Sequence, residues 1–277
     1  MPSGSTMETT MLQYEFMRIA LIVGILLAIA VPIIGVTVVL KRLSMIGDAL
    51  SHASMAGILV GLLLNFNPIL GAMLISLIAA LSIEFIRKRF ERYAELSIAI
   101  ITSAGLGLAA VLLGFVSNAT NFNSFLFGSI VSITTFEFIM VIVVTFMIIG
   151  VALILYRSLF FMAFDEEAAK LSGIKTGWIN LIFTILTALV VSLASRTVGA
   201  LIVSSLMVIP VTCSLVVGRS YLQVVLYSAL FGVFFMIAGL MLSFYQGVKS
   251  GGSIVMVGIV TLVVLMVIKG VMKRIKA

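Results

Sequence analysis

Long apolar stretches separated by short polar turns run along most of the 277-residue chain. Nine of these stretches have about the length of a bilayer-spanning helix, which needs roughly 20 apolar residues. The alternation of period two that marks membrane-barrel strands is missing. The pattern predicts an all-α fold, a polytopic transmembrane helical bundle. The expected spans are about 17–40, 45–64, 69–86, 94–116, 136–156, 178–195, 198–217, 222–245 and 254–270.

The sequence leaves the number of spans open between eight and nine. Residues 1–16 read as a short polar N-terminal segment, and residues 17–277 read as a single transmembrane domain. The stretch from Phe125 to Thr135, FLFGSIVSITT, has the composition of a re-entrant or broken helix. Eight spans are therefore the alternative to nine.

Charge gives the expected orientation. The chain is 62% hydrophobic and only 10% charged, with a net charge of +7. The basic residues lie at the ends of apolar spans, so the positive charge indicates membrane topology and not nucleic-acid binding. One set of loops and ends, from 41–42 to 269–276, holds most of the 17 Lys and Arg residues. This set is expected on the cytoplasmic side. With an odd number of spans, the N-terminus then lies outside and the C-terminus in the cytoplasm. The chain is expected to be a multi-pass protein of the cell membrane.

A carboxylate and the only histidine share one face of the second span. Asp48 and His52 are four residues apart, so both side chains project from the same side of a helix. Such groups are costly in hydrocarbon and usually face a bundle interior or a water-filled path. Imidazole with carboxylate suits a divalent ion such as zinc or manganese. Alternatively, Asp48 caps the helix and His52 bonds a neighbouring helix.

A third acidic group could join this pair. Glu95 begins the fourth span and could reach the same layer as Asp48. The alternative is a solvated interfacial glutamate. Glu84, three residues before Arg87, is explained more simply by a helical ion pair. Arg196 is expected in a short outer turn.

The longest inner segment lies at 161–177, FMAFDEEAAKLSGIKTG. Asp165 can cap a short helix that has Glu166 in its first turn, and Gly173 can end that helix. The segment either links two spans or docks a cytoplasmic partner. The chain contains no GxxxxGK[ST] phosphate loop, so it either uses an ion gradient or depends on a separate ATPase.

A stripe of small residues runs along the second span at Ala49, Ala53, Gly57 and Gly61. Small side chains at four-residue spacing let two helices approach closely. This stripe neighbours the Asp48/His52 face, and we expect it to press that face into the bundle.

Several ordered motifs together resemble the permease subunits of zinc/manganese-type ABC importers, the ABC-3 family. The resemblance runs nearly end to end. The motifs are GDALSHASMAGILVGLLLNFNP at Gly47–Pro68, FLFGSIVSIT at Phe125, AFDEEAAKLSGI at Ala163, VGALIVSSLMVIP at Val198–Pro210 and SGGSIVM at Ser250.

The resemblance implies a permease that has no enzymatic activity of its own. It implies a homodimeric or paired permease, two cytoplasmic ATP-binding cassette subunits, and an extracytoplasmic metal-binding protein that delivers the ion. It places Asp48, His52 and Glu95 on the path of the transported metal, and Asp165, Glu166 and Gly173 in the segment that contacts the ATPase. No cofactor is expected to be bound permanently, and membrane lipid is the other expected partner.

This chain departs from the family pattern at two positions, and neither position can supply an acidic metal ligand here. The family often has an acid after LFG, where this chain has Ser129, and an Asp before the late glycine motif, where this chain reads FYQGVKSGG. The LFGSIV sequence resembles the zinc branch of the family more than the manganese branch, and this resemblance favours zinc over manganese. A manganese or iron importer of the same family is the alternative, and a gradient-driven divalent-metal carrier is a further one.

Overall fold

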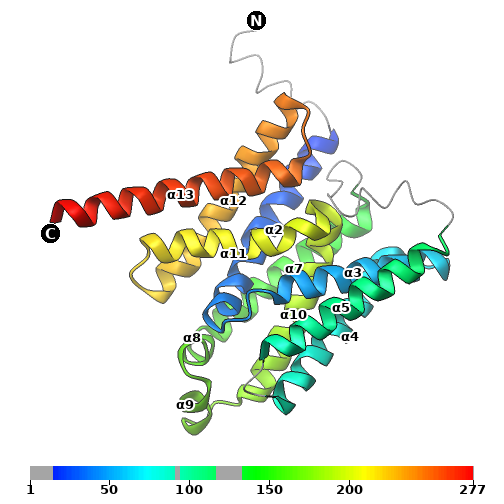
Figure 1. Ribbon diagram of the computed structural model, residues 1–277, viewed down its shortest axis with the longest axis horizontal. Coiled ribbons are helices and arrows are strands. Elements are labelled where there is room, and N and C mark those ends of the chain that lie inside the picture. Colours follow the sequence, from blue (N-terminus) through cyan, green and yellow to red (C-terminus); the bar gives the residue numbers. More distant parts are fainter. Residues whose placement is uncertain (1–14, 91–93, 117–132, 277) are drawn as a thin grey trace, which may run out of the picture.

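The computed structural model describes residues 15–90, 94–116 and 133–276, and within those ranges it contains helices and no strands (Figure 1). The elements are α2 (Glu15–Leu40), α3 (Ile46–Leu63), α4 (Pro68–Arg89), α5 (Ala94–Leu113), α7 (Thr135–Ile154), α8 (Tyr156–Phe164), α9 (Glu166–Leu171), α10 (Thr176–Ala194), the π-helical η4 (Ser195–Gly199), α11 (Ala200–Val217), α12 (Tyr221–Gln246) and α13 (Ser250–Lys276).

Eight of the described helices are long and apolar enough to cross a membrane. They are α2, α3, α4, α5, α7, α10 extended through η4, α12 and α13. The remaining predicted stretch, 198–217, corresponds to α11, whose apolar part, Ile202–Val217, is shorter. The predicted all-α transmembrane bundle is therefore confirmed. The alternative concerning Phe125–Thr135 falls mostly on residues outside the described ranges.

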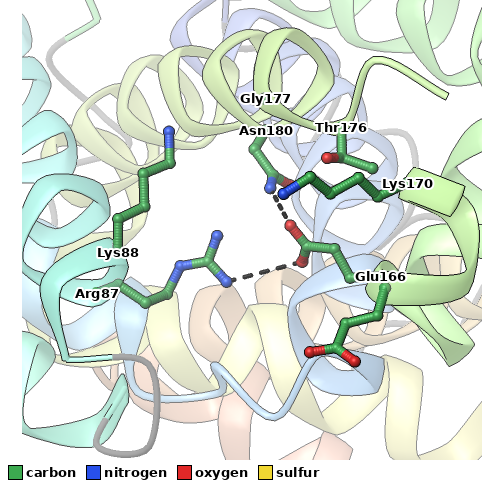
Figure 2. Close-up of a pocket in the computed structure, with 8 residues that line it drawn as sticks. Arg87, Lys88, Glu166, Lys170, Thr176, Gly177 and Asn180 are labelled. Carbon is green, nitrogen blue, oxygen red and sulfur yellow. Dashed lines mark hydrogen bonds and ion pairs between the residues drawn. The ribbon is translucent and has the colours of Figure 1, made fainter. Parts of the chain in front are cut away.

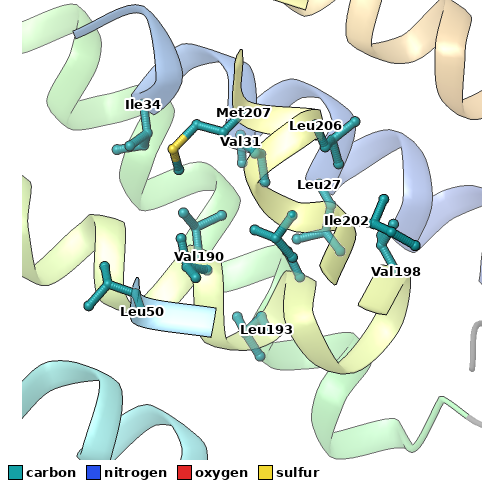
Figure 3. Close-up of a cluster of buried hydrophobic side chains, with 14 of the residues drawn as sticks. Leu27, Val31, Ile34, Leu50, Val190, Leu193, Val198, Ile202, Leu206 and Met207 are labelled. Carbon is teal, nitrogen blue, oxygen red and sulfur yellow. The ribbon is translucent and has the colours of Figure 1, made fainter. Parts of the chain in front are cut away.

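The core forms where α2, α10 and α11 meet. Leu27 and Val31 of α2, Val190 of α10 and Met207 of α11 are all essentially inaccessible and belong to one cluster (Figure 3). Leu50 of α3 lies at the edge of the same cluster. The core therefore fixes α3, the helix with the Asp48/His52 face, against the centre of the bundle.

The junction between α10 and α11 differs from the prediction. Arg196 does not lie in a short turn, because α10 continues as the π-helical segment η4 as far as Gly199. The chain changes direction between η4 and α11 at Gly199. Its φ of +116° is accessible to glycine but is rarely adopted by other residues. Arg196 also approaches the buried carboxylate of Glu137 in α7, with 3.2 Å between Nε and Oε1.

Close backbone packing holds α3 against α4 and α5, as the small-residue stripe predicts. A Cβ placed on Gly57 would overlap the carbonyl oxygen of Gly71 in α4. A Cβ on Gly61 would lie 2.8 Å from Cα of Pro68. On the other side, a Cβ on Gly105 of α5 would lie 3.0 Å from the backbone nitrogen of Ala53. The stripe is confirmed as a packing surface.

The basic ends gather on one side of the bundle. In Figure 1 the end of α4, the α8–α9 segment, the α11–α12 connection and the C-terminus of α13 lie toward the bottom and left. The α3–α4 and α12–α13 connections lie on the opposite side. This separation is the one that the positive-inside rule requires for a cytoplasmic C-terminus.

Candidate functional site

Asp48 and His52 face each other in the first two turns of α3. The distance between Asp48 Oδ1 and His52 Nε2 is 3.6 Å. The His52 side chain is 10% exposed and the Asp48 side chain 28%. The second ring nitrogen, His52 Nδ1, is buried without a hydrogen-bond partner among the described residues. The two alternative structural roles therefore find no support, because Met45 is the N-cap of α3 and His52 bonds no neighbouring helix there.

Glu95 lines the same cavity as Asp48. This cavity has a volume of about 670 Å³ and lies between the start of α3 and the start of α5. The Glu95 side chain is exposed, in contrast to that of His52. The other polar side chains of the wall are the hydroxyl groups of Ser44, Thr102 and Ser103 and the guanidinium group of Arg42. The structure thus brings Glu95 to the cavity without placing it against the Asp48–His52 pair.

The pair has the separation that a shared metal ion requires. Two ligand atoms bound at 2.0–2.2 Å to one tetrahedral zinc ion lie about 3.4 Å apart. The observed distance of 3.6 Å between Asp48 Oδ1 and His52 Nε2 is close to that value. However, no group of three or more His, Cys, Asp or Glu residues that could hold a metal occurs among the residues the structure describes. The chain supplies two ligands that could act together, and the role of Glu95 stays a prediction.

The predicted inner helix forms as α9. Asp165 is its N-cap, and its side chain accepts a hydrogen bond of 2.9 Å from the backbone N–H of Ala168. Gly173 follows the helix with a φ of +84°, and its N–H donates to the carbonyl of Lys170 at 3.1 Å. The predicted cap and the predicted stop are both confirmed.

Glu166 pairs with polar residues of the bundle, and its role toward a partner stays a prediction. It lines a pocket of about 600 Å³ between α4, α9 and α10, which Figure 2 shows. Lys41 Nζ at the end of α2 donates to Glu166 Oε2 at 3.1 Å and to Asn180 Oδ1 at 2.7 Å. The Asn180 amide donates in turn to Glu166 Oε1 at 2.5 Å, and Arg87 Nη1 lies 3.8 Å from Glu166 Oε2. Glu166 therefore attaches α9 to α2 and α10.

Burial and pairing affect the two charged groups of this network differently. The Lys41 side chain is only 7% exposed, and burial lowers its pKa despite the nearby Glu166 carboxylate. The Glu166 side chain is 36% exposed. Burial alone would raise the pKa of Glu166, but the charge of Lys41 and the hydrogen bonds from Lys41 and Asn180 outweigh it, so this pKa is lowered.

Sequence reasoning missed the roles of Lys41 and Asn180. Lys41 counted only toward the cytoplasmic charge, and Asn180 was treated as part of an apolar span. A buried amide in an otherwise apolar helix needs a hydrogen-bond partner, and this was the available signal for Asn180. The expected helical ion pair between Glu84 and Arg87 is present, at 2.9 Å.

Large apolar side chains surround α9 on its outer side. Leu171 is 89% exposed, Phe164 68% and Trp178, at the start of α10, 67%. Gly173 is also exposed, and a Cβ added there would meet nothing within 4 Å. The segment thus presents apolar groups beside its ordered cap and stop.

Comparison with known sequences identifies the family. The sequence matches the model of the ABC 3 transport family over residues 13–269, which is most of its length. The chain belongs to the ABC 3 transport family. As a member of this family it is a multi-pass permease of the bacterial cell membrane.

Relatives of this permease have names that refer to different metals. A "probable metal transport system membrane protein" of Treponema pallidum is 31% identical, over 91% of this chain and 95% of its own. The manganese transport system membrane protein MntC of Listeria innocua is 26% identical, covering 89% of this chain and 88% of its own. The high-affinity zinc uptake system membrane protein ZnuB of Haemophilus influenzae is 28% identical, covering 87% and 93%.

A solved structure has the same fold. PsaBC from Streptococcus pneumoniae in complex with Fab superposes with a TM-score of 0.84 at 24% identity, covering 94% of each chain. At this identity the likeness concerns the fold alone. Ser129, the first of the two departures from the family pattern, lies outside the described residues.

Proposed function

We propose that this permease imports a divalent transition metal, zinc, across the cytoplasmic membrane. The observation that carries the proposal is the Asp48–His52 pair, which lies at the separation of two zinc ligands inside a membrane-spanning helix. The His52 Nε2 end faces the carboxylate, while the rest of the ring is packed among α3 and its neighbours. An ion that must be released again is better served by two protein ligands than by a closed four-ligand site.

The choice of zinc rests on the sequence motif and not on the site. Imidazole and carboxylate accept zinc, manganese and iron alike, and relatives of similar identity are named for zinc and for manganese. Manganese or iron is therefore the alternative cargo. Competition among these ions for uptake would decide between them.

The energy for transport is proposed to come from separate ATP-binding cassette subunits. The chain has no phosphate loop, and its α9 segment offers an ordered cytoplasmic contact. In this proposal Asp165 and Gly173 shape the docking segment, while Glu166 holds it to the bundle. An extracytoplasmic metal-binding protein supplies the ion, and a second permease chain completes the path. Such a second chain would bring another Asp48–His52 pair.

The proposal is tested by radiolabelled zinc uptake in vesicles that contain the permease and its ATPase, with the metal-binding protein added on the extracytoplasmic side. We expect Asp48→Asn and His52→Ala to abolish uptake, and Glu95→Gln to reduce it less, because Glu95 is exposed at the cavity wall. Glu15→Gln is the control, because this exposed carboxylate at the start of α2 lies away from the cavity.

Two results would contradict the proposal. Normal uptake by both the Asp48→Asn and the His52→Ala complexes would reduce the pair to helix packing. Uptake by the permease alone, driven by a proton or sodium gradient and independent of ATP, would favour the gradient-driven carrier instead.

A further inference from the structure

A partly buried polar network connects α9 to the helix that precedes the Asp48 cavity. Its members are Lys41 at the end of α2, Glu166 of α9 and Asn180 of α10, joined by the three hydrogen bonds given above. Lys41 and Glu166 are 125 residues apart in sequence, so the contact is a feature of the tertiary fold. Figure 2 shows Glu166 between Asn180 on one side and Arg87 on the other.

This network is the main polar attachment of α9 to the bundle. Glu166 is the first residue of the six-residue helix, directly after the Asp165 cap. The apolar attachment is small, since Ala169 is the only residue of α9 that is buried. A displacement of α9 would therefore act on Lys41 and Asn180 through Glu166.

The segment after Lys41 leads directly to the cavity. Residues 41–45 join α2 to α3, and Asp48 follows Lys41 by seven residues. The link is tightly hydrogen bonded: the N–H groups of Lys41 and Leu43 donate to the carbonyls of Thr37 and Val38 at 3.0 and 2.9 Å. Leu43 is buried, and its carbonyl accepts from the N–H of Ile46 at 2.9 Å. Such a short, bonded link transmits displacement better than a loose loop does.

The same link forms part of the cavity wall. Arg42, Ser44 and Met45 line the cavity together with Asp48. The carbonyl of Met45 also accepts hydrogen bonds from the N–H groups of Asp48 and Ala49, both at 3.2 Å. A shift of residues 41–45 would therefore move the wall and the first turn of α3 at once.

We propose that Lys41, Glu166 and Asn180 form a linkage that couples movement of α9 on the ATPase to the Asp48 cavity. The three residues are positioning residues, since none of them lines that cavity. The inference rests on the proposed function, because it presumes that an ATPase acts on α9. A purely structural network would instead change stability and leave the coupling of transport to hydrolysis untouched.

The test measures zinc ions taken up per ATP hydrolysed by permease–ATPase complexes in lipid vesicles, with the metal-binding protein added on the extracytoplasmic side. The double variant Lys41→Met/Glu166→Gln removes both charges together, so neither is left buried without its partner. Glu166→Gln alone keeps the shape of the side chain, and Lys41→Arg keeps the positive charge. Glu15→Gln is the matched control, because it makes the same change at an exposed residue that lies at the start of α2, away from α9 and from the cavity.

We expect the double variant to bind the ATPase and hydrolyse ATP while its uptake per ATP falls about tenfold, the usual scale of coupling between two sites. Glu166→Gln should show a smaller fall, Lys41→Arg should keep most of the ratio, and Glu15→Gln should match the wild type. An unchanged ratio in the double variant would overturn the linkage. So would loss of ATPase binding, which would make Glu166 a docking residue.

The proposed function fails in a different way. If the wild-type and Glu15→Gln complexes take up no zinc, the assignment of the cargo or of the transport activity is wrong. A loss confined to the network variants, with normal uptake in both of these complexes, supports the linkage.

Discussion

The close approach of α3 to α4 makes Gly57 a sensitive position. We expect Gly57→Ala to destabilise the bundle, because the new Cβ would overlap the carbonyl oxygen of Gly71 and lie 2.8 Å from Cα of Ala72. These obstacles are backbone atoms and cannot rotate away. The helices must then separate, which would strain the hydrogen bond of 3.2 Å from the Ser76 hydroxyl to the carbonyl of Leu50.

The expected size follows from two opposing effects. Replacing Gly by Ala inside a helix contributes about 1 kcal/mol of stability through helix propensity. Overpacking a close contact costs about 1–3 kcal/mol, and a rigid backbone obstacle places Gly57 at or above the upper end. The net result is a loss of about 2 kcal/mol in the free energy of unfolding, or a factor of about 30 in the folding equilibrium.

The α7 residue Gly150 provides a matched control. A Cβ added at Gly150 meets nothing within 4 Å, so Gly150→Ala keeps the propensity gain without the clash. Thermal unfolding of both variants in detergent should show a lower midpoint for Gly57→Ala and an unchanged or higher one for Gly150→Ala. Zinc uptake should also fall for Gly57→Ala, since α3 carries Asp48 and His52. An unchanged midpoint with full uptake in Gly57→Ala would refute the close packing.

Two further predictions concern the inner segment. Gly173→Leu should weaken co-purification of the ATPase, because the φ of +84° is unfavourable for a residue with a side chain, although the space around Gly173 is open. Gly177→Leu is the control, because Gly177 is exposed and has no such φ, so this variant should fold normally. Equal co-purification of Gly173→Leu and wild type would count against the docking segment. The lowered pKa of Glu166 means that its pairing with Lys41 stabilises the fold fully above the ordinary value of 4.5 and loses this effect as the pH falls through the lowered pKa. The difference in thermal midpoint between wild type and Glu166→Gln should therefore shrink between pH 7 and pH 3, and a constant difference would show that the charge of Glu166 does not matter.

Sequence reasoning succeeded where the physical cause is local. Apolar length alone decides which segments can cross a bilayer, so the helices fell close to the predicted ranges. The Asp165 cap and the Gly173 stop depend on backbone groups within a few residues. The same holds for the pairing of Asp48 with His52, because four residues along a helix return to the same face.

The remaining features depend on contacts between distant segments. Nothing near Lys41 indicates that its ammonium group meets Asn180, 139 residues later. The π-helical continuation of α10 past Arg196 coincides with the approach of Arg196 to Glu137 in α7 and with the positive φ of Gly199, and helix propensity gives no sign of it. The surroundings of Glu95 are equally non-local, because they depend on how closely α5 approaches α3.

The proposed metal site combines local and distant contacts. Spacing along α3 provides the two candidate ligands on one helix face, and Gly105 lets α5 pack closely against the backbone of α3 at His52 and Ala53. The carboxylate of Asp48 is more accessible than the ring of His52, so an ion would reach the oxygen first and the nitrogen second. A site of this kind binds a divalent ion only while water or a second permease chain fills the other coordination positions. In the proposed function such a site would release the ion when the cavity wall at residues 42–45 moves, and the proposed linkage would connect that wall to α9 through Lys41.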